Sequence, residues 1–245
     1  GAVWKDSAAQ CAAGCGVVIT IVGYPKDVEE VYFGENGIIA NAKPGAVLID
    51  MTTTSPKLSE RIYAEAKPRG ISALDAPVSG GDSGAKAGTL SIMVGGDREA
   101  FDACQDVFAA MGTNIIYEGS AGKGQHTKMA NQIALAGAVA SVSEAIAYAR
   151  RTGLDVETML ASISKGAAGS WQMTNNAPKM VAGDMAPGFF IKHFIKDMAI
   201  ADEEAKAAGL TMPVLEEVLE MYRELDRRGE GDLGTQAVIH YFDEK

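Results

Sequence analysis

Short apolar runs alternate with helix-compatible stretches between residues 16 and 119 of this chain. This alternation is typical of a sheet of parallel strands flanked by helices, because neighbouring parallel strands are joined by a crossover long enough to hold a helix. The predicted strands are residues 17–22, 46–50, 72–75, 90–94 and 114–117, and the predicted helices between them are 26–33, 55–67 and 98–111. The first half of the chain is therefore predicted to be an α/β domain.

The strand pattern stops after Gly124, and the rest of the chain has the pattern of helices separated by glycine or proline. The predicted helices are residues 125–151, 156–164, 171–181, 191–208, 213–227 and 236–242. We therefore predict two domains, an α/β domain over residues 1–120 and an all-α domain over residues 121–245, with the first long helix connecting them.

The charge and composition of the chain limit which partners it can bind and in which cellular compartment it is expected. A formal net charge of -10 at pH 7 argues against nucleic acid or an anionic membrane surface as the main partner. The three cysteines and three histidines show no metal-ligand spacing, so we expect a reduced, cytoplasmic protein without a metal. The apolar stretch 129–149 contains Asn131, Gln132 and Glu144, which are costly in a bilayer, so it is predicted to be a long buried helix.

No G-x-G-x-x-G motif opens a helix in this sequence. A dinucleotide-binding sheet uses such a turn, after its first strand, to hold the pyrophosphate. The glycines at 119, 122 and 124 follow the last predicted strand instead, so we interpret them as a hinge and active-site turn. Either the chain lacks an N-terminal piece, or it is not a dinucleotide enzyme.

The segment Asp75-Ala76-Pro77-Val78-Ser79-Gly80-Gly81 ends a predicted strand, where open α/β sheets bind their ligands. The Ser79 hydroxyl and the unobstructed N–H groups of Gly80 and Gly81 are donors that suit a carboxylate. A plain tight turn is the alternative, since proline and glycine favour one.

A polar stripe opens the long helix. Lys128 and Asn131 are three residues apart and share a face, and Gln125 lies a further turn back. A lysine in such a place could exchange a proton with a substrate oxygen. A solvated lysine and a structural asparagine are the alternatives.

A second group of cations lies in the helix predicted at 191–208. Lys192 and Lys196 share a face, Asp197 follows, and anion binding is one use for the pair. Solvation of an amphipathic helix is the alternative for Lys192, and His193 is expected to be a packed or surface histidine.

Taken together, these motifs resemble the β-hydroxyacid dehydrogenase family, particularly its tartronate semialdehyde reductases and 3-hydroxyisobutyrate dehydrogenases. The resemblance spans essentially the whole chain. Four motifs carry it in the expected order: 50–56 (Asp-Met-Thr-Thr-Thr-Ser-Pro), 75–81, Gly124-x-x-x-Lys128-x-x-Asn131, and Lys196-Asp197. Any one of them alone would be unspecific.

The resemblance implies a Rossmann-like domain, a helical domain that carries much of the subunit contact, and a site in the cleft between them. Lys128 is similar to the catalytic lysine that gives a proton to the carbonyl oxygen as hydride arrives. Ser79, Gly80 and Gly81 would hold the substrate carboxylate. Asn131 would orient the substrate, and Gln132 occupies the next position, which is the asparagine in some relatives.

The cofactor residues implied by the resemblance are Val22, Gly23 and Thr53, together with Lys196 from the helical domain. Relatives carry about one more strand-helix-strand unit before the position of Gly1, some 30 or more residues. The Gly-rich loop and the residue that selects NAD or NADP would lie there. We therefore expect a Rossmann-like domain that is incomplete at its N-terminus, and the preference between the two cofactors is unreadable.

The implied activity is the reversible, NAD- or NADP-dependent reduction of 2-hydroxy-3-oxopropionate to glycerate. Alternatives in the same class are dehydrogenases or reductases of 3-hydroxyisobutyrate, succinic semialdehyde or glyoxylate, or a decarboxylating enzyme similar to 6-phosphogluconate dehydrogenase. A non-catalytic dinucleotide-binding and oligomerisation module is the alternative of another class, although the retained Lys128 argues against it. The apolar long helix predicts a homodimer or homotetramer formed through the helical domain.

Overall fold

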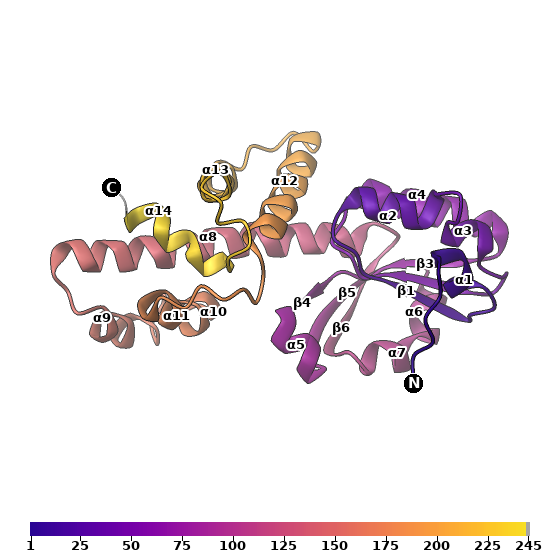
Figure 1. The fold of residues 1–245 in the computed structure, drawn as a ribbon, viewed down its shortest axis with the longest axis horizontal. Helices are drawn as coiled ribbons and strands as arrows, with labels where there is room; N and C mark the ends of the chain where they lie inside the picture. The colour runs from indigo at the N-terminus through magenta and orange to yellow at the C-terminus, as the bar shows by residue number, and fades with distance from the viewer. Residues whose placement is uncertain (244–245) are drawn as a thin grey trace. The chain divides into compact units, whose positions relative to one another are not determined.

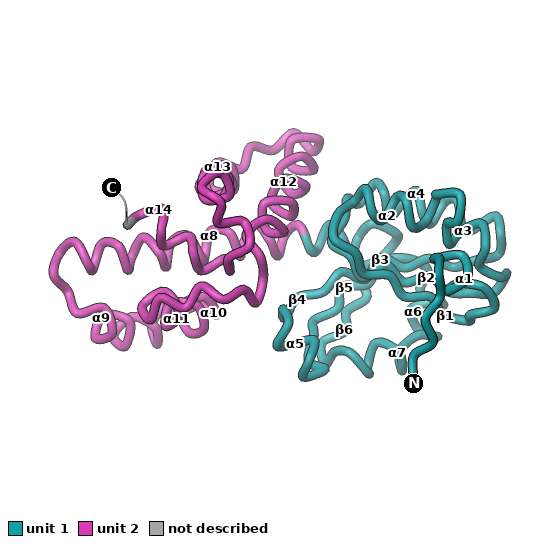
Figure 2. Tube along the Cα trace, viewed as in Figure 1, with its two compact units in different colours: residues 1–128 teal, residues 129–245 magenta. Residues whose placement is uncertain are grey.

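The computed structural model describes residues 1–243 of the chain. It contains two compact units, residues 1–128 and 129–245 (Figure 2). The division falls inside helix α8 (Lys123–Thr152), whereas the sequence analysis placed the boundary after residue 120.

The first unit is built on a six-stranded sheet. Its strands are β1 (Val17–Thr20), β2 (Val47–Asp50), β3 (Ser72–Asp75), β4 (Val78–Ser79), β5 (Leu90–Gly96) and β6 (Gly112–Gly119). The order is β1-β2-β3-β5-β4, with β6 also paired to β5. Strands β1 to β3 are parallel, and so are β5 and β6, but β5 runs antiparallel to β3 and β4.

The prediction of a wholly parallel sheet was therefore wrong. The short strand β4 was not predicted. It follows β3 after only two residues, and the chain then turns back through the short helix α5 (Gly81–Ala87). Gly88, at φ 66°, closes this turn, so β5 returns beside β4 in the opposite direction.

Helices cover both faces of the sheet (Figure 1). The helices of this unit are α1 (Ala8–Ala12), α2 (Pro25–Phe33), α3 (Ile38–Asn41), α4 (Pro56–Ala66), α6 (Arg98–Ala103) and α7 (Gln105–Ala109), with a 3-10 turn at Lys67–Arg69. Leu48 packs in the core under α2, α3 and α4, and its neighbour Ile49 packs on the other face with Phe101 and Phe108 of α6 and α7. Successive strand residues point to opposite faces, so β2 is buried on both sides.

The three predicted helices in this unit begin within one residue of the expected places. Ser55 caps α4 by accepting a hydrogen bond from the N–H of Leu58, and Pro56 occupies the first turn. The helix predicted at 98–111 is interrupted at Cys104, and α1, α3 and α5 were not predicted.

The second unit is helical. Besides α8 it contains α9 (Val156–Ile163), α10 (Trp171–Asn175), α11 (Ala177–Ala182), α12 (Ile191–Ala207), α13 (Pro213–Arg227), a 3-10 turn (Thr235–Ile239) and α14 (His240–Asp243). The helix predicted at 171–181 is divided at Asn176, because Pro178 has no N–H to continue the hydrogen-bond ladder. The segment predicted at 236–242 is likewise part 3-10 and part α-helix.

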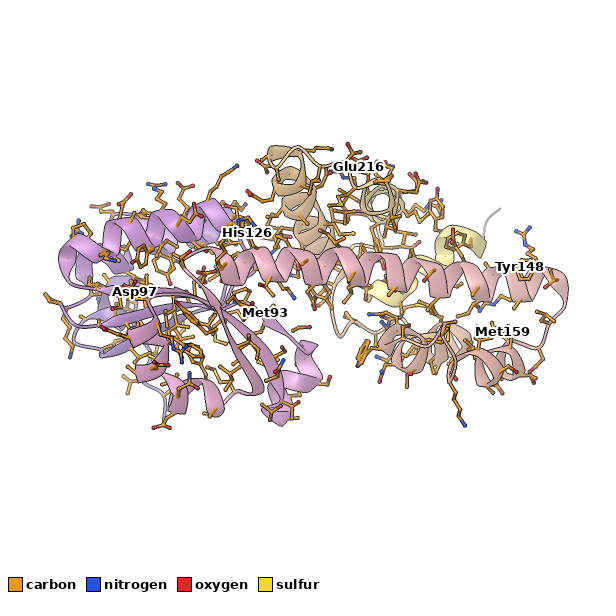
Figure 3. The ribbon with its side chains drawn as sticks, turned by 180° about the vertical axis from the view of Figure 1, so that it is seen from behind. Met93, Asp97, His126, Tyr148, Met159 and Glu216 are labelled. Carbon is orange, nitrogen blue, oxygen red and sulfur yellow. The ribbon has the colours of Figure 1, made fainter. Side chains whose placement is uncertain are left out.

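Helix α8 is buried on one face only. Val139, Val142 and Ile146 are buried in the helical core, whereas Tyr148 on the same helix is 67% exposed (Figure 3). By length and composition α8 is the one helix among the described residues that could cross a membrane, a test that core helices also pass. The long helix was thus predicted correctly in extent, but it is not buried all round.

Tyr222 organises the centre of the helical unit. Its ring meets Phe194 edge-on at 5.1 Å between centroids, and its hydroxyl donates a hydrogen bond of 2.6 Å to the carbonyl oxygen of Thr235. Both ends of this hydrogen bond are buried. Tyr222 therefore links α13 to the 3-10 turn that follows it.

We expect Tyr222→Phe to lower the free energy of unfolding by about 1 to 3 kcal/mol, because it leaves a buried carbonyl without its donor. Tyr148→Phe removes the same hydroxyl from an exposed ring and should change stability by less than about 0.5 kcal/mol. Urea denaturation of the two variants measures both values. Equal losses would show that the Tyr222 hydrogen bond contributes nothing particular to stability.

Candidate functional site

Side-chain hydrogen bonds tie together the carboxyl ends of β1 and β2. The carboxylate oxygen Oδ1 of Asp50 accepts from the Thr20 hydroxyl at 3.0 Å and from the N–H of Thr52 at 3.1 Å. The Thr52 hydroxyl in turn accepts from the N–H of Val22 at 2.9 Å. Parallel sheets bind ligands at this edge, and the predicted cofactor residues Val22, Gly23 and Thr53 all lie here.

Gln125, in the first turn of α8, holds the loop that follows β2. Its side chain is fully buried, and its Nε2 donates to the carbonyl oxygen of Thr52 at 2.7 Å. Its Oε1 accepts from the N–H of Thr54 at 3.1 Å. Gln125 thereby fixes the backbone on both sides of Thr53, which is itself partly exposed.

Asp75, the last residue of β3, caps the beginning of α8. Its Oδ1 accepts from the N–H of Gly122 at 2.8 Å, and its Oδ2 accepts from the N–H of Gln125 at 2.9 Å. Burial raises the pKa of this carboxyl to about 6, although the hydrogen bonds from Gly122 and Gln125 oppose the rise. A carboxylate suits this place because it meets the unpaired N–H groups and the positive end of the helix dipole.

The cap places Lys128 beside the segment that was predicted to bind a carboxylate. Lys128 is 6% exposed, and its Nζ donates to the carbonyl oxygen of Val78 at 2.8 Å. The next residues along the chain are Ser79, which is partly exposed, and Gly80 and Gly81, which are exposed. The structure thus brings Lys128 and this segment together, and the alternative of a solvated lysine was wrong.

The remaining predicted residues lie in the helical unit. The Nε2 of Gln132 donates to Oδ2 of Asp197 at 2.6 Å, and Nδ2 of Asn131 donates to Oε1 of Gln132 at 2.6 Å. The ammonium of Lys196 lies 3.1 Å from Oδ1 of Asp197. Asn131, Gln132 and Lys196 therefore belong to one polar cluster with Asp197.

Two more polar residues of α12, Lys192 and His193, were considered in the sequence. Lys192 forms an exposed ion pair of 2.6 Å with Asp232. His193 is partly buried with its ring edge-on to Phe190, and burial lowers its pKa, with the nearby cations Lys196 and Lys192 adding to the effect. Neither residue has the features of a catalyst, as the sequence analysis expected.

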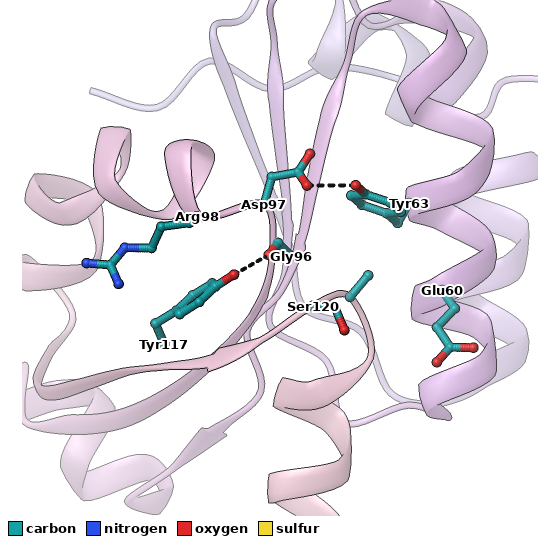
Figure 4. Close-up of a pocket in the computed structure, with 8 residues that line it drawn as sticks. Glu60, Tyr63, Gly96, Asp97, Arg98, Tyr117 and Ser120 are labelled. Carbon is teal, nitrogen blue, oxygen red and sulfur yellow. Dashed lines mark hydrogen bonds between the residues drawn. The ribbon is translucent and has the colours of Figure 1, made fainter.

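A pocket of about 360 Å³ in the first unit contains none of the predicted site residues (Figure 4). It is lined by Glu60, Tyr63, Gly96, Asp97, Arg98, Tyr117, Ser120 and Ala121. Tyr63 donates to Asp97 at 2.7 Å, and Tyr117 donates to the carbonyl oxygen of Gly96 at 3.0 Å. Because these hydroxyls already have protein partners, we place the functional site at the strand ends and around Lys128 instead.

Sequence reasoning missed the organising roles of Asp75, Gln125 and Thr52. Asp75 was noted only as the start of a motif, and Gln125 only as part of a polar stripe. A signal was nevertheless present, since a single carboxylate that closes an apolar strand is unusual enough to require a partner. The hydrogen-bond partner of Asp75 could not be predicted from the sequence, because Asp75 and Gln125 are far apart in the chain.

Comparisons with known proteins cover nearly the whole chain. Residues 1–119 match the family described as the NAD binding domain of 6-phosphogluconate dehydrogenase. Residues 122–242 match the family described as NAD-binding of NADP-dependent 3-hydroxyisobutyrate dehydrogenase. Together the two matches follow the division into an α/β and a helical part.

Individual relatives agree with these matches. An uncharacterized oxidoreductase of Bacillus subtilis is 56% identical over 238 residues, covering 97% of this chain and 83% of that protein. The 2-hydroxy-3-oxopropionate reductase of Escherichia coli is 35% identical over 239 residues, covering 98% and 82%. The solved structure of Mycobacterium tuberculosis 3-hydroxyisobutyrate dehydrogenase with L-serine is similar, with a TM-score of 0.89 and 31% identity over 98% of this chain and 83% of that one.

The raised pKa of Asp75 predicts a pH dependence of stability. A carboxyl whose pKa rises from 3.8 to about 6 on folding stabilises the fold fully below its unfolded pKa, and this contribution is lost as pH rises through about 6. Between pH 4 and pH 7 we expect the unfolding free energy of the wild type to fall by roughly 2 kcal/mol relative to Asp75→Asn. Denaturant titrations at the two pH values measure the difference.

Asp155 provides a control of opposite sign. It caps α9 by accepting from the N–H of Thr158 at 2.8 Å, and the hydrogen bonds from Thr158 lower its pKa. The stabilisation it contributes is present above its unfolded pKa and is lost as pH falls through the lower folded value. If Asp75→Asn and Asp155→Asn changed with pH in the same direction, the assignment for Asp75 would be wrong.

Proposed function

Since the chain belongs to the β-hydroxyacid dehydrogenase family, we propose that it reduces 2-hydroxy-3-oxopropionate reversibly to glycerate. The family makes the chain an oxidoreductase that uses NAD or NADP, with a Rossmann-like domain on a mixed sheet followed by a helical domain. The choice of substrate rests on the Escherichia coli relative named for that reaction. The observation that carries the assignment to this site is the buried Lys128 beside Ser79.

The carboxyl ends of β1 and β2 fit a dinucleotide. Thr52 and Thr54 are buried, whereas Val22, Gly23 and Thr53 are partly exposed and are what this edge presents to a ligand. All three are uncharged, so they set no negative charge against an anionic cofactor. We assign them to contact the cofactor, and we assign Lys196 to the same role from its position in the family motif.

Lys128 is assigned to hold the proton that the reaction transfers. Its ammonium donates to the carbonyl oxygen of Val78, which keeps Nζ beside Ser79. A bound nicotinamide would supply the hydride to the aldehyde carbon. Lys128 would give its proton to the aldehyde oxygen, which becomes the alcohol. In the reverse direction Lys128 takes the proton back.

Ser79, Gly80 and Gly81 are assigned to the substrate carboxylate. A hydroxyl and glycine N–H groups are donors, and glycine leaves the backbone open to a close approach. Gly80 has φ 132°, and a Cβ there would lie 3.1 Å from Cδ2 of Leu90. A side chain at position 80 would therefore disturb the segment even without a ligand. Asn131 and Gln132 are assigned to orient the substrate.

We expect Lys128→Met to lower kcat for 2-hydroxy-3-oxopropionate by about 10² to 10⁴-fold, the usual contribution of a positioned acid–base group. The assay follows loss of nicotinamide absorbance with NADH and with NADPH in parallel. Lys192→Met is the matched control, because it removes an exposed lysine that is paired with Asp232. An unchanged rate in Lys128→Met would exclude this lysine as the proton donor.

We also propose that the chain forms a homodimer or homotetramer through its helical unit. Large apolar side chains are exposed on this unit, including Tyr148, Trp171, Leu210 and Val214. We assign these side chains to contacts between subunits. We expect light scattering at micromolar concentration to give at least twice the 25.6 kDa of one chain, and a monomer would contradict the proposal.

A further inference from the structure

Four polar side chains of the helical unit form one chain of contacts. Asn131 Nδ2 donates to Gln132 Oε1, and Gln132 Nε2 donates to Asp197 Oδ2, both at 2.6 Å. The other carboxylate oxygen of Asp197 lies 3.1 Å from the ammonium of Lys196, as an ion pair without an aligned hydrogen bond. Gln132 is 1% exposed and Asp197 is 2% exposed, so water does not replace these contacts.

The carboxylate gives this chain of contacts a direction. An ionised carboxylate only accepts hydrogen bonds, so Gln132 must turn its NH₂ group towards Asp197. Its Oε1 then faces Asn131 and can only accept, so Asn131 must turn its own NH₂ group towards Gln132. Asn131 Oδ1 is consequently left as an acceptor, and no residue that the structure describes donates to it.

The ammonium of Lys196 lies beside the Asp197 carboxylate and balances its charge. The Lys196 side chain is 12% exposed and that of Asp197 is 3% exposed, and a buried carboxylate without a nearby cation would be costly. The ion pair and the two amide hydrogen bonds therefore depend on one another.

We propose that Asp197 is a positioning residue which, through Gln132, fixes the Asn131 amide so that its Oδ1 accepts a hydrogen bond from a substrate hydroxyl. The inference rests on the proposed function, in which Asn131 orients the substrate. It names the substrate class as semialdehyde acids that carry a hydroxyl besides the reacting aldehyde. Semialdehydes without this hydroxyl leave the acceptor unpaired.

Two substrates that differ only in this hydroxyl test the proposal. These are 2-hydroxy-3-oxopropionate and 3-oxopropionate, each assayed for kcat/KM with the preferred nicotinamide. For the wild type we expect the hydroxylated substrate to be preferred by about tenfold, the value of one neutral hydrogen bond. The ratio of the two kcat/KM values is the readout, because a purely structural loss lowers both values together.

Asp197→Asn is the main variant, since an asparagine can present either oxygen or NH₂ to Gln132 and no longer fixes its direction. We expect the preference to fall to within about twofold of unity. Gln132→Met is the second variant. It removes the side-chain hydrogen bonds of Gln132 to Asn131 and Asp197 and leaves the ion pair of Asp197 and Lys196 in place. The same fall of the substrate preference is expected. It keeps the test decisive if Asp197→Asn does not fold.

Asp202→Asn is the matched control on the same helix. Asp202 pairs with Lys206 at 2.8 Å and has no part in the cluster, so its substitution should leave the ratio at the wild-type value. Thermal unfolding of each variant verifies that the compared proteins are folded.

The outcomes separate the inference from the proposed function. If the wild type oxidises neither NADH nor NADPH with either substrate, the proposed function fails. If it turns over both substrates equally well, the function stands and the inference is overturned. A clear wild-type preference that persists in folded Asp197→Asn and Gln132→Met also overturns it, whereas loss of the preference in these variants and not in Asp202→Asn supports it.

Discussion

The hydrogen bonds from α8 to the Asp75 carboxylate are the contact on which the first unit depends. Asp75 ends β3, and both of its oxygens accept N–H groups from the start of α8. The fit leaves no room for side chains nearby. A Cβ on Gly95 would lie 2.6 Å from Asp75 Oδ1, and a Cβ on Gly124 would lie 2.4 Å from the carbonyl oxygen of Met93. Gly95 in β5 and Gly124 in the first turn of α8 therefore serve close packing around the Asp75 carboxylate.

Once α8 begins at this place, two of its side chains reach different parts of the sheet. Gln125 meets the loop after β2, and Lys128, almost one turn further on, meets the backbone of β4. The loop that holds Thr53 and the segment that holds Ser79 are thus both positioned by contacts with the same helix. A displacement of its first turn would move the loop after β2 and the segment after β3 together, so the buried carboxylate serves to fix that turn.

Much of this arrangement could be predicted from the sequence, and the exceptions have a common cause. Strands β1 to β3 and the start of α4 follow from local apolar runs and from the cap at Ser55. The direction of β5 does not, because strand pairing depends on partners outside the local sequence. The same holds for the site. Ser79 and Lys128 were identified by motif, but that Lys128 is buried against β4 and that Asp75 caps α8 are long-range facts.

Asp75 in the first unit and Asp197 in the second are both buried carboxylates, and the two are balanced differently. Asp75 is met by backbone N–H groups at a helix N-terminus, whereas Asp197 is met by an amide and by the Lys196 ammonium. Backbone N–H groups and a side-chain cation can thus each balance a buried carboxylate, and in both units the carboxylate fixes the direction of the groups that donate to it.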